Sequence, residues 1–136
     1  MGVHERFRSE TSFDTLDLAR DLRRQITAYV LREDRIPKRW RSYYPDPLVK
    51  DAEDVRKYIK IANSIYADKP ERLELRYKYQ TLAIALCEEI QENLIDLEEM
   101  EQFPGVTCDN LKEITKTLDA LYNKLTNWRK TDRVIT

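Results

Sequence analysis

The chain has 136 residues, which is enough for one domain with a substantial core and too few for two. Two Gly, five Pro and 36% charged residues favour long helices with short connections and predict an all-α fold. The formal net charge of −1 excludes an argument for nucleic-acid binding from total charge alone.

The first predicted helix follows a polar segment, residues 1–11, that we expect to form a flexible N-terminal tail. Ser12 can cap this helix, and Pro37 should end it at about Asp34 or Arg35. Its apolar residues recur at helical spacing, and several arginines gather on the opposite side, where a solvated charged face is the simplest interpretation. The apolar residues are Leu16, Leu18, Ala19, Leu22, Ile26, Tyr29 and Val30, and the arginines are Arg20, Arg23 and Arg24.

Residues 36–47 form the most distinctive predicted loop, because three bases and three aromatic residues lie between prolines. Cations suit phosphates and flat rings suit bases, so this composition is compatible with single-stranded nucleic acid. The aromatic rings could equally plug the end of a helical bundle, with the bases pointing to water. Both interpretations stay open for the bases Lys38, Arg39 and Arg41 and the rings Trp40, Tyr43 and Tyr44.

The second predicted helix starts near Pro47 and ends near Tyr66, with one apolar stripe of roughly 140°. A short turn leads into a third helix over residues 70–101, which should therefore be an antiparallel neighbour. The apolar arc of this third helix covers roughly 220°, more than one core contact needs. We expect one side to face the core and the other to face another helix or a second subunit. Arg72 and Arg76 fall inside this arc, where they line a polar seam or reach a ligand.

The fourth predicted helix begins after Phe103-Pro104-Gly105, is capped by Thr107 or Asp109, and ends near residue 130. The predicted domain organisation is thus a tail (1–11), an up-down-up-down antiparallel four-helix bundle (12–130) and a C-terminal tail (131–136). In this topology the loop with Lys38 lies at the opposite end from the start of the third helix. The bases of the chain therefore need not form one patch.

Catalytic and metal-binding chemistry has few candidate residues. His4 is the only histidine and lies in the predicted tail, so a positioned histidine base or a Glu-x-x-His di-iron site cannot be assembled. We predict no cofactor and no metal. One alternative remains: Glu88, Glu89 and Glu92 resemble the magnesium-binding helix of all-α nucleotide pyrophosphatases, although the second Glu-x-x-Asp motif of that family is missing. A solvated acidic face explains these glutamates more simply.

The two cysteines, Cys87 and Cys108, have no metal-ligand spacing, and no secretory signal or membrane-spanning apolar run is present. We expect reduced thiols in a soluble, cytoplasmic protein with no membrane contact. Burial of Cys87 in the apolar arc should raise its pKa.

Four short segments, in this order and spacing, resemble one family of four-helix-bundle proteins. That family includes the ribosomal intervening-sequence proteins and the accessory variability determinant proteins of diversity-generating retroelements. The segments are Ile36-Pro37-Lys38-Arg39-Trp40-Arg41, Ala62-Asn63-Ser64-Ile65-Tyr66, Glu74-Leu75-Arg76-Tyr77-Lys78-Tyr79-Gln80 and Asn127-Trp128-Arg129-Lys130-Thr131-Asp132.

The resemblance implies a non-enzymatic partner of a reverse transcriptase that binds template RNA, and possibly DNA, and supports mutagenic cDNA synthesis. It also implies a homo-oligomer, a pentameric ring. The better-known members are strongly basic, whereas this chain is slightly acidic, so protein docking without nucleic acid stays an alternative. The nucleic-acid-binding positions that the resemblance implies are Lys38, Arg39, Arg41, Arg72, Arg76, Arg129, Lys130 and Arg133.

Overall fold

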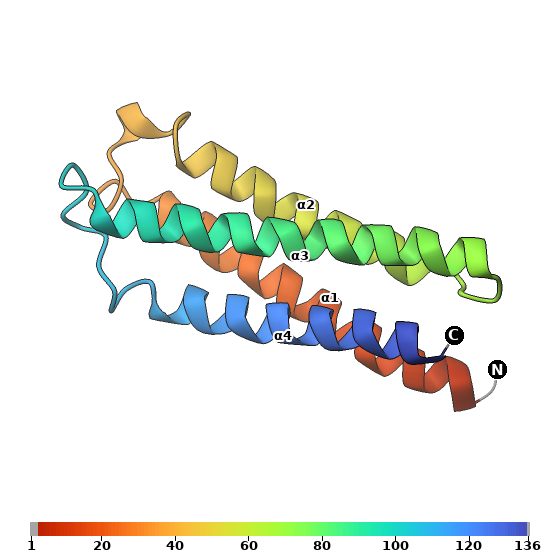
Figure 1. Ribbon diagram of the computed structural model, residues 1–136. Coiled ribbons are helices and arrows are strands. Elements are labelled where there is room, and N and C mark those ends of the chain that lie inside the picture. Colours follow the sequence, from red (N-terminus) through yellow and green to blue (C-terminus); the bar gives the residue numbers. More distant parts are fainter. Residues whose placement is uncertain (1–2, 136) are drawn as a thin grey trace.

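The computed structural model describes the backbone of residues 3–135 and the side chains of residues 14–132. Within this part of the chain there are four α-helices, one short 3-10 helix and no strand (Figure 1). The prediction of an all-α chain with four helices is confirmed. The elements are α1 (Val3–Val30), η1 (Lys38–Trp40), α2 (Pro45–Ser64), α3 (Pro70–Glu99) and α4 (Lys112–Ile135).

Proline sets the start of two helices. Pro45 and Pro70 occupy the first positions of α2 and α3, where the N–H that proline lacks has no helical acceptor to bond. The start of α2 is thus two residues earlier than predicted. α3 ends at Glu99, shortly before the predicted stop at Phe103-Pro104-Gly105.

The outer helices are longer than predicted. α1 begins at Val3 and not at Ser12, and it ends at Val30, before the predicted end at about Asp34 or Arg35. α4 begins at Lys112, a few residues after the predicted caps Thr107 and Asp109, and it continues to Ile135 instead of ending near residue 130. Neither added segment contains a Gly or Pro that would interrupt a helix. The segments predicted as tails, 1–11 and 131–136, are therefore helical over 3–11 and 131–135; residues 1, 2 and 136 lie outside the described residues.

Each helix packs against two others: α1 and α3 both contact α2 and α4, and the contact between α2 and α3 is the most extensive. The α1–α2 and α3–α4 connections lie together at one end of the molecule, and the short α2–α3 turn lies at the other (Figure 1). We call the first the loop end (residues 31–44 and 100–111) and the second the turn end (residues 65–69).

The two connections at the loop end are packed against each other. The hydroxyl of Tyr29 donates a hydrogen bond of 2.5 Å to Asn110 Oδ1, which joins the end of α1 to the α3–α4 connection. A Cβ atom placed on Gly105 would overlap the carbonyl oxygen of Asp34, so this glycine permits a close approach of two backbones. The two connections of the loop end are therefore held together by a hydrogen bond and by close backbone packing.

The core runs the length of the four helices. Ile26, Ile59, Ile90 and Leu121 are fully buried, one from each helix. Among the described residues, no helix has the length and apolar character needed to cross a membrane.

Candidate nucleic-acid interface

The loop that follows α1 folds into the single 3-10 turn η1. Pro37 stands before it in an extended conformation, with ψ of 144°. The turn is closed by hydrogen bonds from the Trp40 N–H to the Pro37 carbonyl (2.9 Å) and from the Arg41 N–H to the Lys38 carbonyl (3.1 Å). Because these bonds fix the backbone, Lys38, Arg39 and Arg41 have defined positions relative to one another.

The aromatic residues of this loop have two different environments. Trp40 and Tyr44 each meet the buried ring of Phe103 edge-on, with ring centroids 5.7 Å apart in both pairs. Tyr43 contacts only the edge of Trp40 in the described ring pairs, and 67% of its surface is exposed. Trp40 and Tyr44 thus plug the end of the core, and Tyr43 alone presents a ring to solvent.

The loop cations differ from most of the basic residues of α1. Lys38 and Arg39 are exposed and Arg41 is half-buried, and none of the three forms an ion pair or hydrogen bond through its side chain with another described residue. The α1 arginines whose side chains are described are, in contrast, paired: Arg20 with Asp17, Arg23 with Glu53 and Arg24 with Asp21. The loop therefore concentrates cations that have no partner inside the described structure.

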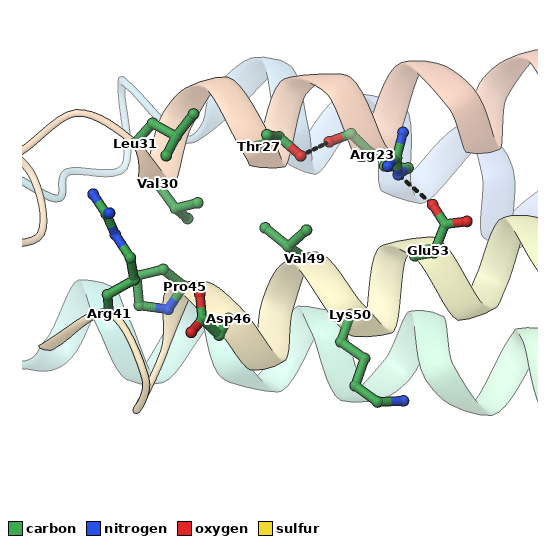
Figure 2. A pocket seen from close by; sticks show the side chains of 10 residues that line it. All are labelled: Arg23, Thr27, Val30, Leu31, Arg41, Pro45, Asp46, Val49, Lys50 and Glu53. Carbon is green, nitrogen blue, oxygen red and sulfur yellow. Dashed lines mark hydrogen bonds and ion pairs between the residues drawn. The ribbon is translucent and has the colours of Figure 1, made fainter.

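Arg41 also borders a shallow groove between α1 and α2, with a volume of about 450 Å³ (Figure 2). The Arg23–Glu53 ion pair bridges α1 and α2 beside the groove. Lys50 points away from the groove and pairs with Asp54 at 2.9 Å. An aliphatic or flat group could lie on the apolar lining with an anion at Arg41. The lining residues are Arg23, Thr27, Val30, Leu31, Arg41, Pro45, Asp46, Val49, Lys50 and Glu53.

Arg76, expected from the resemblance to contact nucleic acid, is instead buried at the turn end. Its Nε and Nη2 donate to the two carboxylate oxygens of Asp132 at 2.8 and 2.6 Å, and its Nη1 donates to the Ile65 carbonyl at 3.3 Å. Gln80 donates a further bond to Asp132 at 2.7 Å. With every nitrogen of its guanidinium engaged, Arg76 is a structural residue in this fold.

The other predicted positions near the turn end have mixed environments. Arg72 is exposed and pairs with Asp68 at 3.4 Å. Arg129 is half-buried, donates to Thr81 Oγ1 at 3.2 Å and lies 5.5 Å from the centre of the Tyr77 ring. Lys130 is exposed, and the side chain of Arg133 lies outside the described residues.

These predicted positions do not form one site. The 30 residues of α3 correspond to a length of about 45 Å, and the two groups lie at opposite ends of that helix. The structure brings together Lys38, Arg39 and Arg41 at the loop end and leaves Arg72, Arg129 and Lys130 near the turn end.

The acidic half of α3 faces water. Glu88, Glu89 and Glu92 are exposed, and the described residues contain no group of three or more His, Cys, Asp or Glu side chains placed to hold a metal ion. Asp51 of α2 lies close enough to Glu89 for the two carboxylates to repel each other. The pKa of the Asp51 carboxyl is raised mainly by partial burial and, to a smaller extent, by the negative charge of Glu89.

Burial raises the pKa of the Cys87 thiol to about 12, as the apolar pattern predicts. Cys87 therefore stays protonated and unreactive at neutral pH. Cys108, the other thiol, is exposed in the α3–α4 connection.

Sequence reasoning offered a polar seam as one alternative for Arg76, which the structure confirms, but it missed the partners Asp132 and Gln80, although a signal for Asp132 existed. The apolar stripe of α4 runs through Leu121, Leu125 and Trp128, and Asp132 is the next position at the same spacing. An acid inside one apolar stripe and an arginine inside another are the two halves of a buried pair.

No protein-family model matches this chain, and the searches of curated proteins and of solved structures also found no match. The geometry of the molecule and the residue patterns of its sequence are therefore the basis for a functional proposal.

Proposed function

We propose that this protein is a non-enzymatic RNA-binding accessory factor, and that the loop end is its RNA contact. The proposal depends on the three cations of one fixed loop: Lys38 and Arg39 lie in the 3-10 turn and Arg41 directly follows it. None of the three has an ion-pair partner among the described residues. Cations that a fold does not neutralise internally are available to phosphates.

The geometry of the loop end favours single-stranded over double-stranded RNA. Tyr43 offers one open ring for a base to stack on, in the same loop as the three cations. The groove beside Arg41 has a mostly apolar lining of the kind that accepts the flat face of a base. Binding of this type is electrostatic in large part and depends steeply on salt.

The family resemblance extends this proposal to a partner and an assembly. The bundle has the up-down-up-down antiparallel topology and assists the reverse transcriptase of a diversity-generating retroelement. The protein acts by scaffolding: it holds template RNA, and possibly DNA, near the polymerase while mutagenic cDNA is made. It also self-associates, and the resemblance implies a ring of five copies.

The test is a charge-reversal variant, Lys38→Glu with Arg39→Glu and Arg41→Glu. Its affinity for a single-stranded RNA should fall at least about a hundredfold at low salt. The slope of log affinity against log salt should become shallower by about two, the value for three lost phosphate contacts on a single strand. Circular dichroism and thermal unfolding would check that the bundle is intact.

The matched control changes three exposed lysines near the turn end, Lys57→Glu, Lys60→Glu and Lys69→Glu. It alters net charge equally but leaves the loop end intact. Equal losses in both variants would mean that only total charge matters. Unchanged binding of the loop variant at moderate salt would refute the assignment and favour an interaction module without nucleic acid.

A further inference from the structure

The outer face of α3, turned away from the core, is only partly polar. Leu75 and Leu82 are 44% and 37% exposed, and Ala85 is exposed beside them. Leu86, on the shoulder of this face, is half-buried. We call residues 75–89 of this face the α3 stripe. Within one copy of the chain, no other helix covers it, because α3 packs on α2 and α4 through its other sides.

The charges that flank the α3 stripe are self-complementary. Lys78 and Glu89 are both exposed, and neither forms an ion pair with another described residue. They are 11 residues apart, so they lie on the same face within about 20° and about 16 Å from each other along the axis. Their midpoint lies between Leu82 and Ala85. An antiparallel copy of α3 centred there would place each Lys78 opposite the other copy's Glu89.

A second feature is that Glu89, at one end of the α3 stripe, lies near another carboxylate of the same copy. Asp51 on α2 lies near Glu89 on α3, and partial burial, together with the charge of this neighbouring carboxylate, raises the pKa of Asp51. The nearest cation to Asp51 along α2, Lys50, forms its ion pair with Asp54. A lysine supplied from outside would remove this repulsion.

We propose that two copies of this chain associate through α3 in an antiparallel, two-fold arrangement, with Leu82 of each copy packed against Ala85 and Leu86 of the other. Two Lys78–Glu89 ion pairs flank this apolar centre. The small side chain of Ala85 allows the two helices to approach closely.

The geometry confines the contact to the middle of α3. The same register places Glu71 opposite Asp96 of the other copy, which would be unfavourable. These residues lie about 19 Å from the centre, and packed helices cross at about 20° or more, so their axes have separated there. Lys78 and Glu89 lie only about 8 Å from the centre, where the helices are still in contact.

This contact differs from the ring that the family resemblance implies. A patch that pairs with itself closes with two copies, whereas a ring of five needs two different patches on each copy. The contact uses one face of residues 75–89, which is fewer residues than the roughly 20 to 30 per side of a standard stable interface. The dimer should therefore be weak and form at micromolar or higher concentration. The inference goes beyond the RNA-binding proposal and uses a different surface.

The experiment measures molar mass by light scattering over a wide range of protein concentration, for the wild type, Lys78→Glu and Glu89→Lys. The wild type should approach the mass of two copies. Each single variant turns both ion pairs into repulsive pairs, so its dimer should be at least about tenfold weaker. Lys116→Glu, an exposed lysine change on α4, is the matched control and should dimerise as the wild type does.

Mixing the two single variants gives the sharpest readout. In a mixed dimer, both pairs again join Glu to Lys, so association should return to near the wild-type strength. A mass of five copies, association of the single variants equal to the wild type, or a monomer up to hundreds of micromolar would each overturn the proposal. RNA binding depends on the loop end, so these outcomes leave that proposal to be judged separately.

Discussion

Arg76 and Asp132 form a bidentate ion pair in the interior, with N–O distances of 2.8 and 2.6 Å. Their side chains are only 6% and 8% exposed. The pair joins the first turns of α3 to the last turns of α4, and the Ile65 carbonyl ties it to the end of α2. The Arg76 guanidinium therefore connects three helices at the turn end.

Loss of the Asp132 carboxylate should strongly destabilise the folded protein. Asp132→Ala leaves the Arg76 guanidinium buried without its partner, which should lower the free energy of unfolding by about 3 to 5 kcal/mol. Urea unfolding monitored by circular dichroism measures this loss in the free energy of unfolding. The double variant Arg76→Met with Asp132→Leu removes both charges and should recover most of the loss. A loss below about 1 kcal/mol in Asp132→Ala would place the pair in solvent-like surroundings.

Substitution of Tyr43 should affect RNA binding, whereas substitution of Tyr44 should affect stability. Tyr43→Ala should weaken binding of single-stranded RNA by about 1 to 3 kcal/mol, the usual value of one stacked base, and leave stability within about 0.5 kcal/mol. Tyr44→Ala should instead lower stability by about 1 to 3 kcal/mol, because its ring packs on Phe103. RNA titration and urea unfolding on both variants separate the two effects. Equal RNA affinity of Tyr43→Ala and wild type would show that Tyr43 does not stack on a base.

The close approach of the two connections predicts a sensitive glycine. Gly105→Ala should lower the free energy of unfolding by about 1 to 3 kcal/mol or more, because the new methyl group meets the Asp34 backbone, which cannot rotate away. Thermal unfolding measures the loss. Glu101→Ala, an exposed change in the same connection, is the control and should stay within about 0.5 kcal/mol of wild type. A stable Gly105→Ala protein would mean that the connections separate easily.

Asp51 should make stability depend on pH. Partial burial, and then repulsion from Glu89 and Asp54, raise the pKa of Asp51 in the folded protein above its unfolded value. The folded state therefore holds this proton more tightly, and stability falls as pH rises through the folded pKa. Asp51→Asn should be more stable than wild type at neutral pH by less than about 1 kcal/mol, and the difference should vanish in acid.

Urea unfolding of Asp51→Asn at several pH values measures this difference. Asp119→Asn, an exposed change on α4, controls for the loss of one negative charge. A constant difference between Asp51→Asn and wild type at all pH values would contradict an origin in the ionisation of Asp51.

The helical character of the chain follows from its sequence alone. Apolar residues at helical spacing, the scarcity of glycine and the prolines at the starts of α2 and α3 are local properties, so they predict helices without knowledge of the fold. The ends of α1 and α4 were predicted less well. Polarity suggested loose tails, whereas the segments have no residue that breaks a helix, and Asp132 is held by Arg76.

The tertiary structure decided which polar residues remain available. The sequence placed Arg76 inside an apolar arc but left open whether it lines a polar seam or reaches a ligand, and it did not distinguish the rings of Trp40 and Tyr43. Packing then buried Arg76 against Asp132, 56 residues away in sequence, and placed Trp40 on Phe103. A sequence pattern reports the residues along one helix, but a side chain becomes free or engaged only when another helix supplies, or fails to supply, its partner. For this reason the sequence determined the four helices, and only their packing separated the exposed cations of the loop end from the buried arginine of the turn end.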